Sequence, residues 1–157
     1  DQVFVEPRIV ITEGGITQAI IESEVVKVYE SRDTSYTSLN DSLVIEFFNE
    51  EGEHTSTLIA DRGEVWGLYT NVDSLKATGN VYITSSERNA SIEAEAIRWL
   101  AFNRMVHGAG LVTLETEDGF ERGYGFEAKD DLSEYRFSGS VEGELRDVDT
   151  PETEGDQ

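Results

Sequence analysis

Few residues in this chain have the types and spacing that catalysis requires. The 157 residues include no cysteine and only two histidines, His54 and His107. Without cysteine, thiol catalysis and disulfide bonds are excluded. His54 lies beside a predicted turn and His107 on the polar side of a predicted strand, so both are expected to be solvated. No Ser-His-Asp order and no phosphate-binding loop occurs, so we predict no catalytic residue, no cofactor and no metal site.

Carboxylates are abundant, but nothing singles out a pair. The chain has 33 Asp and Glu residues, and no two of them are marked as the acid and base of a glycosidase. Asp130 and Asp131 stand together and would suit a cation, although a turn is the plainer interpretation. Trp66 and Trp99 would suit stacking against sugars, although strand tryptophans more often cap the edge of a core. The protein is therefore predicted not to be an enzyme.

The net charge limits the classes of partner that the protein can bind. The formal net charge is -21, with 12 basic residues in all. Such a surface repels nucleic acid and anionic membranes, because phosphate binding needs clustered Lys and Arg. Two explanations remain open: an acidic surface adapted to high salt, where the Debye length falls to roughly 3 Å at 1 M, or a surface that binds cations. The acids are scattered rather than clustered, which favours the first.

One short phrase recurs along the chain: an apolar residue, a gap, a small residue, a gap, glycine, a gap and valine. It occurs at 75–81, with one extra residue at 58–65, again at 135–141, and in a degenerate form at 92–97. Its odd positions are apolar or small and its even positions mostly polar, which is the period of a strand with one buried face. The repetition suggests stacked, similar strands.

The rest of the chain also favours strands. Strong or long strand candidates are 16–29 (or a bulged pair), 43–48, 54–61, 63–70, 74–85, 91–100, 104–117, 120–128 and 134–146. We expect a loop over 30–42, a turn over 49–53 and a hairpin at Asp118-Gly119. Pro7 and Pro151 lie outside the proposed sheet. Residues 1–146 are predicted to form one domain, and 147–157 a disordered acidic tail.

Alternation along these strands predicts which residues face inward. The apolar set includes Leu43, Ile45 and Phe47; Leu75, Ala77, Gly79, Val81 and Ile83; Val106, Gly108, Gly110, Val112 and Leu114; Phe120, Tyr124, Phe126 and Ala128; and Tyr135, Phe137, Gly139, Val141, Gly143 and Leu145. The fold class is therefore all-β: an open β-jelly-roll, or twisted antiparallel sandwich of stacked strands. The interior glycines and alanines fit either strand curvature or room for a ligand.

The order of these motifs resembles the LptC family, the periplasmic component of the lipopolysaccharide export bridge. The resemblance covers roughly residues 15–145. It rests on the phrase at 75–81, on the Glu-Ala-x-x-Trp rung that ends at Trp99, and on a closing segment. In that segment Gly-Tyr-Gly-Phe at 123–126 is followed by Tyr-Arg-Phe-Ser-Gly at 135–139. Two features depart from the family: an N-terminal membrane-anchoring helix is missing from this stretch, and the chain is unusually acidic.

The resemblance implies an OstA-like β-jelly-roll in the periplasm, tied to the inner membrane by an N-terminal segment that this chain does not include. It implies lipopolysaccharide as the ligand, an inner-membrane ATP-driven (ABC) transporter as one partner, and a periplasmic jelly-roll bridge protein as the next. The domain would shelter acyl chains without chemistry. Residues predicted to line the lipid path are Leu43, Ile45, Phe47, Leu75, Val81, Ile83, Val112, Leu114, Phe126, Phe137 and Val141.

The same resemblance implies head-to-tail joining through unpaired edge strands. The last strand is the predicted edge for the bridge protein, with Tyr135, Gly139, Val141, Gly143 and Leu145 as its partner-binding residues. The first strand, around 3–11, would face the transporter. An unpaired edge can also close on a second copy, which would give a homodimer. The alternative function is a structural or adhesive acidic β-sandwich module without a lipid ligand.

Overall fold

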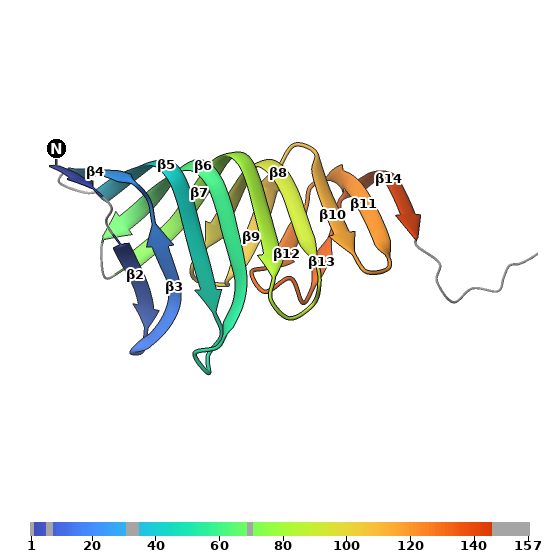
Figure 1. The fold of residues 1–157 in the computed structure, drawn as a ribbon, viewed down its shortest axis with the longest axis horizontal. Helices are drawn as coiled ribbons and strands as arrows, with labels where there is room; N and C mark the ends of the chain where they lie inside the picture. The colour runs from blue at the N-terminus through green and yellow to red at the C-terminus, as the bar shows by residue number, and fades with distance from the viewer. Residues whose placement is uncertain (1, 6–7, 31–34, 69–70, 146–157) are drawn as a thin grey trace, which may run out of the picture.

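The computed structural model describes residues 2–5, 8–30, 35–68 and 71–145, and this part of the chain is all-β (Figure 1). Its first strands are β1 (Gln2–Val5), β2 (Arg8–Glu13), β3 (Ile16–Glu22), β4 (Val25–Glu30) and β5 (Ser35–Phe48). The next are β6 (His54–Leu68), β7 (Asn71–Ser85), β8 (Ser91–Leu100), β9 (Met105–Ala109) and β10 (Val112–Thr116). The last are β11 (Gly119–Tyr124), β12 (Glu127–Lys129), β13 (Tyr135–Arg136) and β14 (Gly139–Leu145). The predicted fold class is confirmed.

All of these strands belong to one antiparallel sheet that folds over on itself into two layers. One layer contains β2, β3, β10, β11 and β14, and the other contains β1, β4, β9, β12 and β13. The long strands β5, β6, β7 and β8 run through both layers. β5 pairs with β3 along one half and β4 along the other, β8 pairs with β10 and then β9, and β6 and β7 lie between β5 and β8 along both halves. We call the first layer A, the second layer B, and the fold line between them the corner (Figure 1).

The corner is where the recurring phrase lies. In β7, Gly79 and Asn80 both have positive φ, 88° and 49°, and the pairing register shifts there against both neighbouring strands. A Cβ on Gly79 would lie 2.6 Å from Oδ2 of Asp61, which is on the corner of β6, so only glycine fits. Asn80 donates a hydrogen bond to the same carboxylate over 2.9 Å. The phrase thus marks a bend in each strand rather than a straight rung.

The core lies between the layers and runs without a break along the molecule. Its largest fully buried side chains are Trp99, Phe47, Phe126, Ile21, Leu39, Leu43, Ile45, Leu58, Leu75, Ile83, Ile92 and Ile97. Burying a large apolar side chain of this kind stabilises the fold by about 1.5–3 kcal/mol. The two layers are therefore held together mainly by apolar packing, whereas neighbours within a layer also share backbone hydrogen bonds.

Several predicted elements need correction. The predicted loop over 30–42 is wrong where the structure describes it, since 35–42 is the first half of β5. The candidate 16–29 is two strands, β3 and β4, because the chain turns the corner between them. The candidates 104–117, 120–128 and 134–146 are each split in the same way. The predicted hairpin is confirmed, but its two-residue turn is 117–118, one residue earlier than predicted, since Thr116 pairs with Gly119. The predicted tail, 147–157, lies outside the described residues, as do Pro7 and Pro151.

The bends where strands cross the corner also reverse the predicted orientation of some residues. Tyr124 precedes the corner residue Gly125, whose φ is 67°, and Phe126 follows it. Phe126 is buried, but Tyr124 is exposed, because a corner of one residue switches the alternation to the other face. Phe120 is half-buried on the same outer face as Tyr124, and Gly110 is exposed at its own corner. The inward assignments of these three residues are therefore wrong.

Candidate functional site

The middle of the predicted lipid path coincides with the hydrophobic core. Most residues predicted to line the path are buried there: Leu43, Ile45, Phe47, Leu75, Val81, Ile83, Val112, Leu114 and Phe126. Their inward orientation is confirmed, while their contact with lipid stays a prediction. Side chains from the two layers meet there, and the rings of Phe47 and Trp99 lie 5.6 Å apart. A ligand in this region would require the layers to move apart.

The path becomes open at the C-terminal end. Phe137 is half-buried, with its ring 5.0 Å from that of Phe126. Val141 is 61% exposed, so its predicted place in a buried interior is wrong. Val141 lies where the register of β14 shifts between Glu142 and Ser140, so it has no paired residue on β11. Layer A also continues through β14 here, whereas layer B ends at the two-residue strand β13. No described strand lies opposite β14 across the interior.

The register of β14 shows which of its residues face the interior. Leu145 pairs with Gly119, and Gly143 pairs with Glu121, which itself pairs with the buried Leu114. Directly paired residues share a face, so Gly143 and Leu145 lie on the inner side, as predicted, although Leu145 is 82% exposed. Tyr135 shares the inner side of layer B in the same way, because it pairs with the buried Ala128.

Gly139 is the exception among the predicted partner-binding residues. It pairs with Tyr124 on the outer face, because the register of β14 against β11 shifts between Arg122 and Gly123. The prediction that Gly139 points inward is therefore wrong. Ser140 takes the inner place, and its hydroxyl donates to Glu121 over 2.9 Å. Within the described sheet β14 pairs with β11 alone, so its other edge has unpaired backbone groups.

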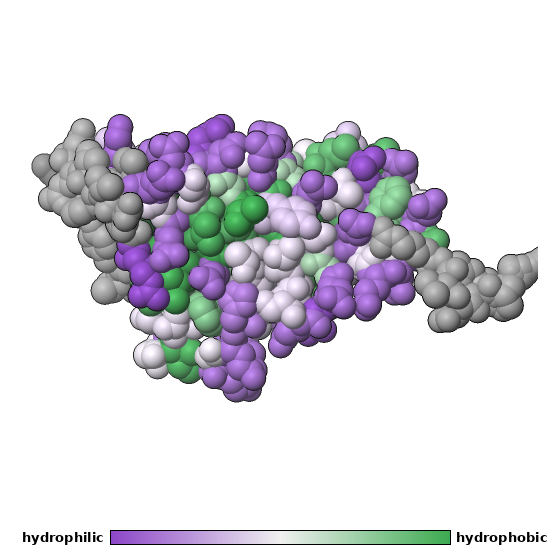
Figure 2. All heavy atoms as spheres, in the orientation of Figure 1, coloured by the Kyte–Doolittle hydropathy of each residue, from purple (hydrophilic) through white to green (hydrophobic). Residues whose placement is uncertain are grey.

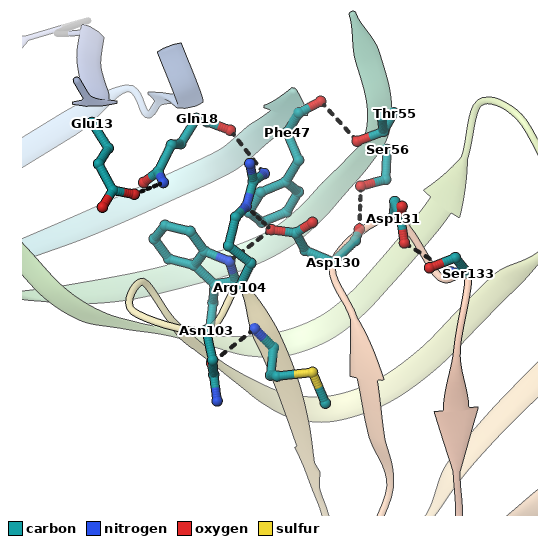
Figure 3. A network of polar contacts seen from close by, with 12 residues as sticks. Glu13, Gln18, Phe47, Thr55, Ser56, Asn103, Arg104, Asp130, Asp131 and Ser133 are labelled. Carbon is teal, nitrogen blue, oxygen red and sulfur yellow. Dashed lines mark hydrogen bonds and ion pairs between the residues drawn. The ribbon is translucent and has the colours of Figure 1, made fainter. Parts of the chain in front are cut away.

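Opposite the corner, the free ends of the two layers meet along a line that we call the seam. Two hydrogen bonds cross it near the middle (Figure 3). Ser56 of layer A donates its hydroxyl to the backbone carbonyl of Asp130 over 2.5 Å. Arg104, in the turn after β8, donates from Nη2 to the backbone carbonyl of Gln18 on β3 over 3.4 Å. We call these four residues, with Trp99, the seam cluster.

Asp130 is the centre of the seam cluster. Its Oδ2 accepts hydrogen bonds from Arg104 Nε at 2.8 Å and from Trp99 Nε1 at 3.0 Å (Figure 3). Burial raises the pKa of the Asp130 carboxyl above its ordinary value, while the Arg104 guanidinium and the Trp99 N–H act in the opposite direction. The expected turn is confirmed, since the Leu132 N–H donates to the Lys129 carbonyl over 2.8 Å. Within this turn the buried Asp130 carboxylate has the chain's own Arg104 as its cation.

Grooves flank the seam cluster on both sides. One, of about 630 Å³, has walls from both layers: Ile11, Thr12, Glu13, Gly14 and Gln18 on one side, and Val72, Asp73, Ser74, Leu100, Ala101 and Phe102 on the other. The second, of about 300 Å³, lies between the 49–51 turn and the loop at 129–131.

The histidines and tryptophans that the sequence offered as candidates for chemistry all contact neighbouring side chains. His54 is partly exposed, with Nε2 2.9 Å from the Thr57 hydroxyl and Nδ1 2.7 Å from that of Ser86. His107 is exposed to the same extent as His54, with its Nδ1 3.3 Å from Glu127 and its Nε2 buried. Trp99 is in the core, and Trp66 lies on the outer face of layer B beneath Arg98.

Two searches of the described residues bear on binding and membrane insertion. No group of three or more His, Cys, Asp or Glu side chains in this part of the chain is placed to hold a metal ion. In the same residues, no helix has the length and apolar character needed to span a membrane.

The seam cluster was missed by sequence reasoning for a simple reason. Ser56, Arg104 and Gln18 have no shared spacing and lie far apart in the chain from Asp130. The one local signal was the Asp130-Asp131 pair followed by Leu132, which is itself buried. Only the fold brings the four polar groups together.

A charge row on the outer face of layer B gives a first testable prediction. Glu127 pairs with His107 and Arg136 across the sheet, and Arg136 Nε donates to its carboxylate over 2.8 Å. This hydrogen bond lowers the pKa of Glu127. A lowered pKa stabilises the fold above the ordinary pKa of glutamate, and that contribution is lost as the pH falls through the lowered value. We expect R136Q to raise the pKa of Glu127 in a carboxyl ¹³C NMR titration, and R122Q to leave it unchanged; an unchanged value in R136Q would contradict the assignment.

Comparison with known proteins adds no family assignment. No protein-family model matches the chain, and a search of curated proteins found no match.

Proposed function

We propose that this protein is a non-enzymatic scaffold for lipopolysaccharide transport in the periplasm, held at the inner membrane by a segment outside this chain. It would receive lipid from an ATP-driven transporter and pass it to a jelly-roll bridge protein. The observation that carries the proposal is that the inner face of layer A continues beyond layer B to a free edge strand. Along that face buried Leu114 is followed by Glu121 on β11 and then by Gly143 on β14, with Leu145 two residues further along β14.

The physical requirement for such a scaffold is large. Each CH₂ group exposed to water costs about 0.8 kcal/mol, so one twelve-carbon acyl chain costs roughly 10 kcal/mol. A continuous apolar interior between two layers can shelter such a chain, while the charged sugars stay in water. A free edge strand can add a strand from the next jelly-roll, which would continue both the sheet and its apolar face.

Site-specific photocrosslinking tests this function. A photoreactive residue at Phe47, on the inner face, is expected to crosslink lipopolysaccharide when the transporter is active. Tyr82, which is 37% exposed on the outer face of β7, two strands away from β5, is the matched control and should not crosslink. Crosslinking at both positions, or at Tyr82 alone, would contradict an interior path.

The alternative is an acidic structural or adhesive module without a lipid ligand. The filling of the central interior by side chains from both layers favours it, because a permanently packed core has no room for acyl chains. A folded protein that crosslinks at neither position beside an active transporter would support this alternative.

A further inference from the structure

The seam differs from the corner in how it holds the layers together. At the corner the layers are joined covalently by strands that run through both. At the seam they are joined by side-chain packing and by the two hydrogen bonds of the seam cluster. Because the corner is continuous backbone, the easiest separation of the layers is a hinge about the corner that opens the seam.

The larger groove leads toward the interior. Two of its lining residues, Ile11 and Val72, belong to the buried core. Phe102, which is 84% exposed, projects from the turn between β8 and β9 at its rim. Behind the groove wall lies Ala19, fully buried and paired with both Ile11 and Phe47. The groove is therefore separated from the predicted lipid path by one layer of side chains.

The seam cluster fixes the position of the side chains that separate the groove from the predicted lipid path. Gln18 lines the groove, and its backbone carbonyl is the acceptor for Arg104. Arg104 is in turn fixed by Asp130, whose own backbone carbonyl accepts the hydroxyl of fully buried Ser56. If the two hydrogen bonds across the seam break, the two walls of the groove can move apart while all strand pairing within each layer remains.

We propose that the seam is a lateral gate for acyl chains: the groove beside Phe102 receives the chain, and the seam cluster must release before it enters the interior. This inference rests on the proposed lipid-transport function. It explains how a core that is packed without ligand can admit one, since the chain would replace contacts between layers as they separate.

Thiol labelling can detect the gate without any lipid, because the chain has no cysteine of its own. A19C places a reporter behind the groove, and A77C places one in the core next to the corner; both alanines are fully buried. The releasing variant is S56A/R104K, which removes both cross-seam hydrogen bonds and keeps a positive charge beside Asp130. The matched control is T55V, because the buried Thr55 hydroxyl donates to Phe47 within layer A and does not cross the seam.

We expect S56A/R104K to raise the labelling rate of A19C about tenfold or more, from the loss of two hydrogen bonds. The rate at A77C should stay within about twofold, and T55V should change neither reporter by more than that. Equal acceleration at A19C and A77C would indicate global unfolding and overturn the gate. An unchanged rate at A19C would also overturn it.

A second arm separates the gate from the proposed function. With the photoreactive residue at Phe47 and lipopolysaccharide as the probe, S56A/R104K is expected to crosslink faster than the parent. If the parent crosslinks and the releasing variant is no faster, the seam is not the way in and the gate is wrong. If the parent does not crosslink at all while A19C labelling still responds, the lipid function fails and the opening of the seam is retained.

Discussion

Replacing Arg104 with methionine is expected to lower the free energy of unfolding by about 3–5 kcal/mol at neutral pH, because it leaves a buried carboxylate without its counter-charge. Methionine keeps most of the aliphatic packing of arginine but supplies no hydrogen-bond donor. Asp130 would then retain one side-chain donor, Trp99 Nε1. Denaturant unfolding monitored by tryptophan fluorescence measures the loss.

The same variant should show a defined pH dependence. Burial already raises the pKa of Asp130, and removal of the guanidinium would raise it further in the folded state only. Between the unfolded and folded values the folded state then binds more protons, so stability increases as the pH falls through the folded pKa. The deficit of R104M should therefore be fully present at neutral pH and shrink in acid.

Two controls make this prediction specific. R104M/D130N should recover most of the loss, because the uncompensated charge is removed together with its partner. R122M removes an arginine that is paired with Glu142 over 2.7 Å at the surface, and should cost less than about 1 kcal/mol. A cost for R104M no larger than that of R122M would show that the Asp130 pair contributes little to the fold.

Adding one methyl group at Gly123 is expected to detach β14 from the sheet. A Cβ at this position would overlap the carbonyl oxygen of Gly139 on β14, and this oxygen belongs to the backbone and cannot rotate away as a side chain could. Overpacking of this kind costs about 1–3 kcal/mol. Since β14 is the last described strand and pairs with β11 alone, separation of the two strands is the simplest relief.

Hydrogen exchange measures this detachment directly. In G123A, the β14 amides that donate to β11 should lose about tenfold to a hundredfold in protection, while the amides of β5 to β8 stay protected. G139A is the matched control, because a Cβ there would have open space around it. A uniform loss of protection across the sheet would contradict the prediction. If β14 is the edge that joins the next jelly-roll, G123A should also weaken end-to-end binding, and G139A should not.

Local alternation was enough to predict much of the fold. In β7 the predicted inner residues are buried and Tyr82 is exposed, because the corner there contains two residues and so restores the alternation. The hairpin between β10 and β11 could be predicted from the sequence to within one residue, because a two-residue turn depends mainly on its own residues. The all-β class followed in the same way, since the period of two recurs along most of the chain.

The polar first half of β5 shows where local reasoning failed. Residues 35–42 are mostly Ser, Thr, Asn and Asp, which favours a loop. In the structure this segment pairs with β4 on one side and β6 on the other, so its backbone hydrogen bonds are satisfied. Thr37 and Leu39 are buried, and the residues that alternate with them, Tyr36, Ser38 and Asn40, are partly exposed. Membership of the sheet was decided by neighbours that are distant in sequence.

The sequence by itself determined the strands, the apolar character of one face of each, and the repeated phrase, because these depend on residues within a few positions of one another. The tertiary structure alone decided that the phrase is a corner, that Tyr124 and Gly139 face outward, and that Asp130 has Arg104, Trp99 and Ser56 as partners. The number of residues in a corner sets the face of everything after it. The partners of a buried charge depend on which ends of the two layers meet. Neither the face of a residue after a corner nor the partners of a buried charge can be predicted from the spacing of neighbouring residues.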